Sequence, residues 1–461
     1  MNLYAVVLAA GQGKRMNSKL FKVLHPVCGK PMVGHVIDTL EEINVNRTVV
    51  IVGHGVETVK GYLGTKVEYA LQEQQLGTGH AVLQAKPALS NEQGLTIVIY
   101  GDTPLVKAQT LNKMIEQHRA SGAVITMLTA KLDNPFGYGR IIRNSEGHVA
   151  KIVEQKDCSQ AEAHVNEINA GTYVFDNQKL FAALDLVGNN NSQGEYYLTD
   201  VIDILKGEGH IVEAYCTDDS NESLGVNDRL QLAEAERCMQ ARINRVHMTN
   251  GVTMIDPGQT YIEKGVQIGS DSVLFPGTIL RGNTVIGEGC EIGPNTEIYN
   301  SQVGDEVIIK NAVVQAAVVD NGASIGPFAY VRPGSRIGKS VKIGDFVEIK
   351  NATIGDGSKV SHLSYIGDAN IGSGVNFGCG AITVNYDGFN KSLTEVGDDV
   401  FIGSNVNLIA PVSIGKGAYV VAGSTITHNV KEGDLAIARE RQTNKEGYAD
   451  IIRRKMKAKK Q

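Results

Sequence analysis

The chain has 461 residues, a formal net charge of −6 and a pI near 6.0. This length accommodates two or three domains, and the acidic balance gives no indication of a nucleic-acid or membrane-surface protein. No apolar run approaches the roughly 18 residues of a spanning helix, and no signal-peptide leader precedes the first strand. The six cysteines lie apart without a CxxC pair, which favours reduced thiols over disulfides or a zinc site. We therefore expect a cytoplasmic protein.

Residues 1–228 alternate short β-branched runs with helical stretches. The runs at 4–9, 47–53, 95–102 and 123–130 are typical of strands, and the segment between the first two has room for a crossover helix. This alternation predicts an α/β, Rossmann-like domain with a mostly parallel sheet. Because ligands bind beyond the carboxyl ends of strands in such sheets, the loops after 4–9 and 95–102 are candidate site segments.

The first of these loops, LAAGQGKRM, places Gly11 and Gly13 beside Lys14 and Arg15. It does not fit the Walker pattern, and Met16 stands where the dinucleotide fingerprint needs its last glycine. Glycines let backbone N–H groups approach a phosphate closely, and adjacent cations neutralise its charge. On these residues alone, phosphate binding and an ordinary strand-to-helix turn remain equally open.

Residues 229–250 change character and predict a linker helix. The stretch 229–249 contains no glycine or proline, and apolar residues recur at helical spacing before Asn250-Gly251, a plausible stop. The recurring residues are Leu232, Ala235, Met239, Ile243 and Val246.

Residues 251–437 follow a hexapeptide pattern in which an aliphatic residue precedes glycine. Its aliphatic positions are separated by multiples of six, for example 268 to 286, 286 to 292, 325 to 337 and 337 to 343. This spacing predicts a left-handed parallel β-helix whose aliphatic side chains stack in the core. The period breaks between Ile371 and Val396, where the polar segment TVNYDGFNKS is expected to loop out of the stack. Residues 438–461 form a basic tail, more typical of a solvated end than of a binding arm.

Several motifs of the first half occur together in one known family. They are LAAGQGKRM, Lys22, QEQQLGTGHA, YGDTPL, FGYGRI, Glu154, Asn169 and GVNDR. The set resembles the sugar-1-phosphate nucleotidyltransferases. With the hexapeptide repeats attached, the chain is similar over essentially its whole length to bacterial bifunctional N-acetylglucosamine-1-phosphate uridyltransferase/glucosamine-1-phosphate acetyltransferases. The resemblance implies a uridyltransferase domain over 1–228 and an acetyltransferase domain over 251–437, which together make UDP-N-acetylglucosamine for cell-envelope synthesis.

For the first domain, the resemblance implies a nucleotide site with Mg²⁺ and UTP. Asp102 and Asn227 match the magnesium ligands, and Arg15 and Lys22 match basic residues that face the triphosphate. On the residues alone, Asp102 could equally be a helix N-cap before PLVKAQTL. The remaining UTP and UDP-sugar positions are Leu8, Ala9, Ala10, Gly11, Gln72, Gly77, Thr78, Tyr100, Gly139, Glu154 and Asn169. Phe21 departs from the family, which often has proline before the lysine.

For the second domain, Arg332 and Lys350 are cations suited to a sugar phosphate, and His362 lies among small polar residues. A lone histidine is usually structural, yet acetyl transfer to an amine needs a base that titrates near neutrality. The resemblance assigns that base to His362. It places Tyr365, Asn376 and Lys391 with Arg332 and Lys350 at glucosamine-1-phosphate, and Cys379, Asn385, Tyr386, Ser404, Ala422 and Arg439 at acetyl-coenzyme A. CGAIT and ARERQ depart from the commoner AGTIT and SRVPQ on the coenzyme side.

The expected partners are small molecules and further copies of the chain. We expect glucosamine-1-phosphate, N-acetylglucosamine-1-phosphate, UTP and acetyl-coenzyme A as substrates, and a homotrimer formed through the β-helix, with no nucleic acid and no membrane span. One alternative is a single-activity sugar nucleotidyltransferase whose β-helix only regulates or oligomerises. A second is a non-catalytic scaffold, which Lys22, Asp102 and Asn227 argue against.

Overall fold

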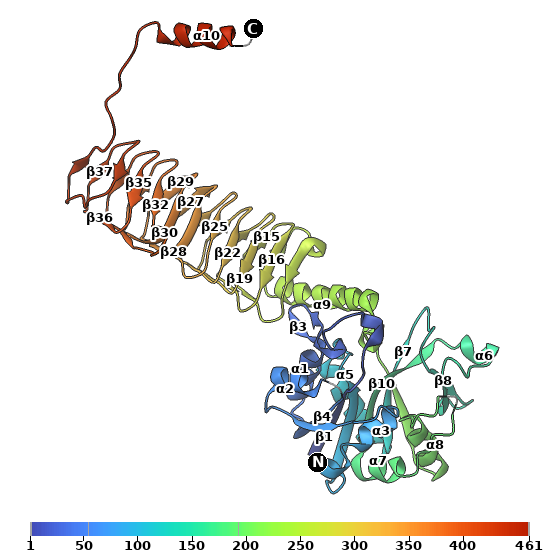
Figure 1. Ribbon diagram of the computed structural model, residues 1–461. Helices are drawn as coiled ribbons and strands as arrows, with labels where there is room; N and C mark the ends of the chain where they lie inside the picture. Colours follow the sequence, from blue (N-terminus) through green and yellow to red (C-terminus); the bar gives the residue numbers. More distant parts are fainter. Residues whose placement is uncertain (1, 54, 192, 460–461) are drawn as a thin grey trace. The chain divides into compact units, whose positions relative to one another are not determined.

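The computed structural model describes residues 2–53, 55–191 and 193–459, and the chain divides into two compact units, Met1–Ile243 and Asn244–Gln461 (Figure 1). The boundary between the units falls within helix α9 (Arg229–Thr249), at the residues for which the sequence predicts a helix. Each unit is described by itself.

The first unit is built on a mostly parallel sheet with the strand order β11-β7-β10-β6-β1-β4-β5, to which β8 and β9 are attached. Strand β1 pairs parallel with β4 and β6, whereas β10 runs antiparallel to β6 and β7. This confirms the predicted fold class, and the four predicted strands are β1, β4, β6 and β7. The strands are β1 (Asn2–Ala9), β4 (Arg47–Val52), β5 (Glu68–Leu71), β6 (Gly94–Tyr100), β7 (Ile125–Lys131), β8 (Arg140–Arg143), β9 (Val149–Val153), β10 (Glu167–Asp176) and β11 (Val212–Cys216), with the short pair β2 (Pro26–Val27) and β3 (Lys30–Pro31) beside them.

Helices cover both faces of this sheet. They are α1 (Met32–Glu42), α2 (Val56–Leu63), α3 (Thr78–Leu83), α4 (Lys86–Leu89), α5 (Ala108–Ser121), α6 (Gln160–Ala163), α7 (Asn177–Leu184) and α8 (Asp200–Gly207), with the 3₁₀ turns η1 (Lys14–Met16), η2 (Lys22–Leu24) and η3 (Ser220–Ser223). Along β1, Ala5 and Val7 point into one core and Tyr4 and Val6 into the other. A strand that is buried on both faces has a continuous apolar sequence, which is why YAVVLA shows no alternation of apolar and polar residues.

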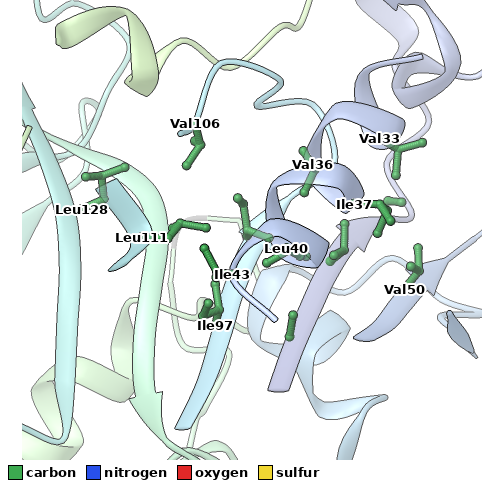
Figure 2. Close-up of a cluster of buried hydrophobic side chains, with 14 of the residues drawn as sticks. Val33, Val36, Ile37, Leu40, Ile43, Val50, Ile97, Val106, Leu111 and Leu128 are labelled. Carbon is green, nitrogen blue, oxygen red and sulfur yellow. The ribbon is translucent and has the colours of Figure 1, made fainter. Parts of the chain in front are cut away.

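Helix α1 shows how the first core is filled. Its residues Val33, Val36, Ile37 and Leu40 recur at helical spacing and belong to the same buried cluster as Val50 and Ile97 of the sheet, all of which are labelled in Figure 2. An apolar stripe with this spacing covers one side of a helix, so it buries that side against the strands.

Helix α9 contributes to a smaller core of the first unit. Ala235 and Cys238 are buried there, and Leu232 and Met239 pack partly buried against the same cluster. Val246, which continues the predicted apolar stripe, is instead 58% exposed. The amino-terminal half of the helix is therefore part of the first unit's fold.

The second unit is a parallel β-helix, as the hexapeptide spacing predicts. One face is an 11-stranded sheet, and a 17-stranded sheet forms the rest of the wall, with parallel pairing throughout. The aliphatic residues of the repeat point inward: Ile286, Ile292, Ile337 and Ile343 are at most 2% exposed. Ile268, near the first coil of the stack, is only partly buried.

The strands of the 11-stranded sheet are β12 (Thr253–Met254), β15 (Val273–Leu274), β18 (Glu291–Ile292), β21 (Ile308–Ile309), β24 (Ser324–Ile325), β27 (Lys342–Asp345), β29 (Lys359–His362), β31 (Asn376–Phe377), β34 (Phe401–Ile402), β37 (Tyr419–Val420) and β39 (Leu435–Ala436). Those of the 17-stranded sheet are β13 (Thr260–Ile262), β14 (Gln267–Ile268), β16 (Thr278–Arg281), β17 (Val285–Ile286), β19 (Glu297–Tyr299), β20 (Gln302–Val303), β22 (Val313–Gln315), β23 (Val318–Val319), β25 (Tyr330–Val331), β26 (Arg336–Ile337), β28 (Glu348–Ile354), β30 (Tyr365–Ile371), β32 (Ile382–Val384), β33 (Thr394–Val396), β35 (Asn407–Ile409), β36 (Val412–Ile414) and β38 (Thr425–Ile426). The turn η4 (Pro257–Gln259) precedes β13.

Two segments leave the coil pattern. Residues 385–393 loop out between β32 and β33, as the broken period predicts, and Phe389 at their tip is 91% exposed. Helix α10 (Tyr448–Ala458) follows a wholly exposed stretch and has no buried residue. Among the described residues, no helix combines the length and apolar character needed to cross a membrane.

Candidate active sites

Two adjoining cavities lie at the carboxyl ends of β1 and β6. The smaller, of about 230 Å³, is lined by every residue predicted for the uridine pocket: Leu8, Ala9, Ala10, Gly11, Gln72, Gly77 and Thr78. The larger, of about 480 Å³, is lined by the predicted sugar-pocket residues Gly139, Glu154 and Asn169. The two cavities share Lys22, Thr78, Tyr100, Asp102 and Glu195. A cation and a carboxylate therefore stand where the two cavities meet.

At this junction the Lys22 ammonium contacts the Asp102 carboxylate and lies 3.2 Å from the amide oxygen of Asn227. Backbone bonds set the arrangement, because the Val226 N–H donates to the Asp102 carbonyl oxygen at 2.9 Å. The Asn227 amide nitrogen donates to the Gly225 carbonyl oxygen at 3.3 Å, which directs the amide oxygen toward Lys22. The three predicted residues are thus brought together from η2, the end of β6 and the loop before α9.

The donor set at the junction fits a hard divalent cation. Asp102 and Asn227 offer carboxylate and amide oxygens, and an ammonium group already sits against both. Magnesium is usually held by one or two such protein oxygens together with substrate phosphates and water. In the described part of the chain, no group of three or more His, Cys, Asp or Glu side chains could hold a metal by itself. The residues present therefore suit Mg²⁺ carried with a nucleotide.

The helix N-cap interpretation of Asp102 is wrong. Helix α5 begins at Ala108 with Lys107 as its N-cap, well after the aspartate. Asp102 is only 7% exposed and has the Lys22 ammonium as its partner. A buried carboxylate needs such a partner to remain charged.

The opening glycine loop is neither a Walker loop nor an α-helix start. It leads into the three-residue turn η1, so no long helix dipole points at the cavity. Gly13 has φ +61°, and an added Cβ would lie 2.6 Å from the Lys22 Cβ, so glycine permits this close approach. Arg15 is exposed on η1 and lines neither cavity, which separates it from the other predicted residues of this site.

Hydrogen bonds within the fold hold the walls of the larger cavity. The Asn169 N–H donates to the Gly139 carbonyl oxygen at 2.9 Å, and the Asn169 side-chain amide donates to the Tyr173 hydroxyl at 2.7 Å. Burial, followed by the charges of Asp157 and Asp200, raises the pKa of Glu154. Burial likewise raises the pKa of Tyr100, so its hydroxyl stays protonated and can donate. The cavity thus presents several oriented hydroxyl, amide and carboxyl groups, as sugar recognition requires.

Sequence reasoning missed the segment from Gln193 to Thr199, which lines the larger cavity with Glu195 and Tyr197 among other residues. The Gly79 N–H donates to the Tyr196 carbonyl oxygen at 2.8 Å, and the Tyr196 N–H to that of Leu76 at 2.8 Å. No glycine loop or strand end marks this segment in the sequence, and tertiary pairing with 76–79 brings it to the site.

In the second unit, three predicted sugar-phosphate residues share one wall of the β-helix. Arg332 follows β25, and Lys350 and Tyr365 lie on the adjoining β28 and β30. The Arg332 guanidinium bonds Glu348 at 2.7 Å. Burial acts to lower the pKa of Lys350, but its bond to Asp368 and the proximity of Tyr365 raise that pKa overall. Both cations are therefore held near the tyrosine.

One corner of the β-helix collects the predicted base and three residues predicted to contact the coenzyme. His362, Cys379, Ser404 and Ala422 take the equivalent position on successive coils, each just before a left-handed residue. N–H groups of the next coil donate to the carbonyl oxygens of His362, Cys379 and Ser404 at 3.3, 2.8 and 2.8 Å. The Arg439 side chain passes Gly423, beside Ala422, and the exposed His362 ring contacts Asp345. The predicted acetyl-transfer residues thus form a continuous ladder.

The remaining predicted residues are not members of this ladder. Asn385 contacts Asp368 at the base of the 385–393 loop, and Tyr386 pairs with Lys391 in a bridge within that loop. Asn376 begins β31 on the 11-stranded sheet, a different face from Tyr365. The structure therefore distributes the predicted sugar residues over two faces of the β-helix.

Known protein families match both units. The MobA-like NTP transferase domain matches residues 5–165, and the bacterial transferase hexapeptide (six repeats) matches residues 260–300 and 394–428. A solved UDP-glucose pyrophosphorylase in complex with UDP-glucose has 17% identity and a TM-score of 0.45, covering 52% of this chain and 100% of that chain. This likeness is too weak to bear on function.

Relatives that match over nearly the full length are much more similar. The bifunctional protein GlmU of Geobacillus thermodenitrificans is 58% identical over 99% of both chains. That of Bacillus velezensis is 58% identical over 98% of this chain and 99% of its own, and that of Enterococcus faecalis is 55% identical over 97% and 98%. Because identity of this level extends across both units, the chain belongs to the GlmU family of bifunctional proteins.

Proposed function

We propose that the chain acetylates glucosamine-1-phosphate with acetyl-coenzyme A and then transfers UMP from UTP to N-acetylglucosamine-1-phosphate, releasing pyrophosphate. The product is UDP-N-acetylglucosamine, a precursor of peptidoglycan and other envelope polymers. Membership of a family of bifunctional proteins fits two activities in one chain. The observation that carries the proposal is the junction of Lys22, Asp102 and Asn227, where the cavity lined by the predicted uridine residues meets the cavity lined by the predicted sugar residues.

For uridylyl transfer, the two cavities hold the reactants so that the sugar phosphate faces the nucleotide's α-phosphorus. An oxygen of the sugar phosphate forms a bond to that phosphorus while the bond to the β-phosphate oxygen breaks, and pyrophosphate leaves. Lys22 stands between the cavities and neutralises the charge gathered there, a role in which positioning and electrostatics supply most of the rate. Mg²⁺, held by Asp102 and Asn227 with the phosphates, would add further charge neutralisation.

For acetyl transfer, the exposed ladder of the β-helix supports His362 as the base. It takes a proton from the glucosamine nitrogen as that nitrogen bonds to the acetyl carbon and the thiolate of coenzyme A departs. The cations Arg332 and Lys350 suit the sugar phosphate, and Cys379, Ser404, Ala422 and Arg439 follow on successive coils toward the coenzyme.

A homotrimer is part of the proposal. The predicted sugar residues lie on two faces of the β-helix, and we expect a neighbouring copy to complete the site. The corner beside His362 also exposes Phe328, Phe346 and Leu363 at 58%, 56% and 60%. Three large apolar side chains in a row are typical of a covered surface. A cytoplasmic location remains a prediction that suits nucleotide and coenzyme substrates.

The test is incubation with glucosamine-1-phosphate, acetyl-coenzyme A, UTP and Mg²⁺, with free thiol and pyrophosphate followed separately. We expect thiol release without UTP, and pyrophosphate release only when acetyl-coenzyme A is present. Pyrophosphate release with no thiol at any stage would support the single-activity alternative, and release of neither product would overturn the proposal.

A further inference from the structure

The imidazole of His362 has a carboxylate partner that the sequence does not mark. Its Nδ1 lies 2.6 Å from Oδ1 of Asp345. The two residues are register partners at the ends of β27 and β29 on neighbouring coils. The Leu363 N–H also donates to the Asp345 carbonyl oxygen at 2.9 Å. Because backbone pairing holds both residues, the meeting of the two side chains is built into the stack.

We propose that Asp345 is a positioning residue for acetyl transfer, accepting a hydrogen bond from Nδ1–H of His362 so that Nε2 is free to act as the base. This inference rests on the proposed acetyl transfer. A neutral imidazole carries its proton on one nitrogen, and a carboxylate can only accept, so the pair selects the tautomer with the proton on Nδ1. The lone pair then resides on Nε2, the nitrogen directed away from Asp345.

The proton balance of the reaction shows what the carboxylate contributes. As the glucosamine nitrogen bonds to the acetyl carbon and the carbon–sulfur bond breaks, Nε2 takes the nitrogen's proton and His362 becomes a cation. Asp345 stabilises that imidazolium by its opposite charge. The proton then passes to the departing thiolate, which restores the neutral histidine and yields free coenzyme A. The carboxylate takes no part in bond making, so its effect is on orientation and charge.

The neighbouring residues support Asp345 as the residue that positions His362. The hydrogen bond to His362, foremost among several causes, holds the pKa of Asp345 below its usual range, so the carboxylate is charged at neutral pH. Glu348, the other nearby carboxylate on the same coil, is engaged by Arg332 at 2.7 Å. On the following coils the equivalent position holds Cys379, Ser404 and Ala422, none of them acidic. The other charged residues on the two strands that carry the pair are Lys342 on β27 and Lys359 on β29, and the charge of Lys342 also acts to lower the pKa of Asp345.

Kinetics of three variants test the inference in the full-length enzyme. We expect Asp345→Ala to lower kcat of acetyl transfer by roughly 10²-fold, with KM values within about threefold of wild type, since an unoriented base loses most of its contribution. Asp345→Asn preserves the shape and the hydrogen bonding of the side chain without its charge, so we expect a smaller loss of kcat than in Asp345→Ala. Asp320→Asn, which removes a carboxylate from the inter-coil ion pair with Arg336, is the matched control and should behave as wild type.

The split between the two kinetic constants separates positioning from mere structural support. A loss confined to kcat indicates a base that is wrongly oriented, whereas a distorted wall of the β-helix would also raise KM for the substrates. Circular dichroism melting of each variant reports whether the β-helix is folded, and uridylyl transfer, carried by the other unit, should be unchanged. Wild-type kcat in both Asp345 variants would overturn the inference.

The tautomer gives a readout that does not depend on activity. In ¹⁵N-histidine-labelled wild-type protein, with His362→Gln used for assignment, the neutral His362 should carry its proton on Nδ1, and Asp345→Ala should shift it toward Nε2. A proton on Nε2 in the wild type would overturn the inference even if acetyl transfer proceeds. Conversely, an Nδ1 proton in an enzyme that releases no thiol would uphold the contact and refute the proposed function.

Discussion

Asp102 and Asn227 illustrate how the fold, rather than sequence proximity, creates a site. The first lies just beyond β6 and the second just before α9, and the Val226–Asp102 backbone bond joins their segments. Both oxygens then face the Lys22 ammonium, which lines both cavities. A change at any one of these side chains should therefore act on uridylyl transfer alone.

Asp102→Asn tests this directly. The substitution keeps the shape of the side chain but removes the charge that balances Lys22 and would bind Mg²⁺. We expect uridylyl transfer to fall by roughly 10²–10³-fold, the scale of losing one electrostatic contact in a transition state, with a raised Mg²⁺ requirement. Acetyl transfer should stay within a few-fold of wild type. Asp185→Asn, at a surface pair with Lys86, is the control, and parallel loss of both activities would contradict the assignment.

Glu154 provides a prediction about pH. Burial raises its pKa from the ordinary 4.5, so the folded unit holds this proton more tightly than the unfolded chain does. The folded state is therefore favoured while the group is protonated, and its stability falls as the pH rises from about 4.5 through the raised pKa. Glu154→Gln removes this loss of stability at rising pH, because glutamine does not ionise. The melting temperature of the variant should exceed that of wild type increasingly from pH 4 to pH 7, whereas the exposed Glu116→Gln should show no such trend.

The residues that sequence could and could not predict differ in a physical way. The loop at 8–11 lines a cavity, as expected at the carboxyl end of a parallel strand, whereas Glu154 follows the antiparallel strand β9 and was indicated only by the family resemblance. Glu195 and Asp345 reach their sites only through pairing between distant segments, which leaves no local pattern. The role of Arg15 stays a prediction: its motif points to a phosphate contact, while η1 leaves the side chain exposed and outside the lining of both cavities.

At the scale of elements, the hexapeptide period predicts the β-helix well because each aliphatic residue has one available place, the interior. Ile309 is fully buried on β21, while Ile308 beside it is 36% exposed. Alternation of this kind fixes which side of every short strand faces inward. The predicted fold class followed from this spacing, whereas the conformation of the 385–393 loop could not, since no stacking constraint acts on it.

The neighbouring pair Ile309 and Ile308 allows a matched measurement. Ile309→Ala should lower the free energy of unfolding of the β-helix by about 2–5 kcal/mol, because it leaves a cavity in a packed core. Ile308→Ala should change it by less than about 1 kcal/mol, since its side chain is partly solvated. Denaturant unfolding followed by circular dichroism would check both values. Equal effects would show that the two residues do not alternate as described.

At the scale of the whole molecule, the division of α9 sets where the chain can be cut. Ala235 and Cys238, with Leu232 and Met239, complete a core that includes Met32 of α1. A fragment ending at Ile243 should therefore fold and release pyrophosphate from UTP and N-acetylglucosamine-1-phosphate without acetyl-coenzyme A. A fragment ending at Arg229 exposes that core and should melt at a clearly lower temperature. Equal melting of the two fragments would contradict this role of α9, and an inactive but folded longer fragment would contradict the separability of the activities.

The corner that carries Phe328, Phe346 and Leu363 provides the whole-molecule test of the proposed homotrimer. All three residues have left-handed φ angles of 45–58°, a region that costs bulky side chains roughly 1–2 kcal/mol each. Adjacent coils place Asn311, Gly380 and Asn405 at the same corner, residue types that tolerate this conformation. Phe328 and Phe346 also stack with ring centroids 5.4 Å apart. An unfavourable backbone and an exposed apolar surface at one place are both explained if a second copy covers the corner.

The double variant Phe328→Asn/Phe346→Asn tests whether a second copy covers the corner. The substitution should have opposite effects on an exposed corner and on a corner buried between copies. In an isolated chain, asparagine should relieve backbone strain and leave the fold unchanged or slightly more stable. If the corner is buried between copies, the variant should instead dissociate to a lower mass in light scattering and lose acetyl transfer while retaining uridylyl transfer. Tyr419→Ser, which removes an exposed aromatic from the other stacked pair of the β-helix, is the control and should preserve the assembly. A double variant that remains trimeric and active would place the contact between copies elsewhere on the β-helix.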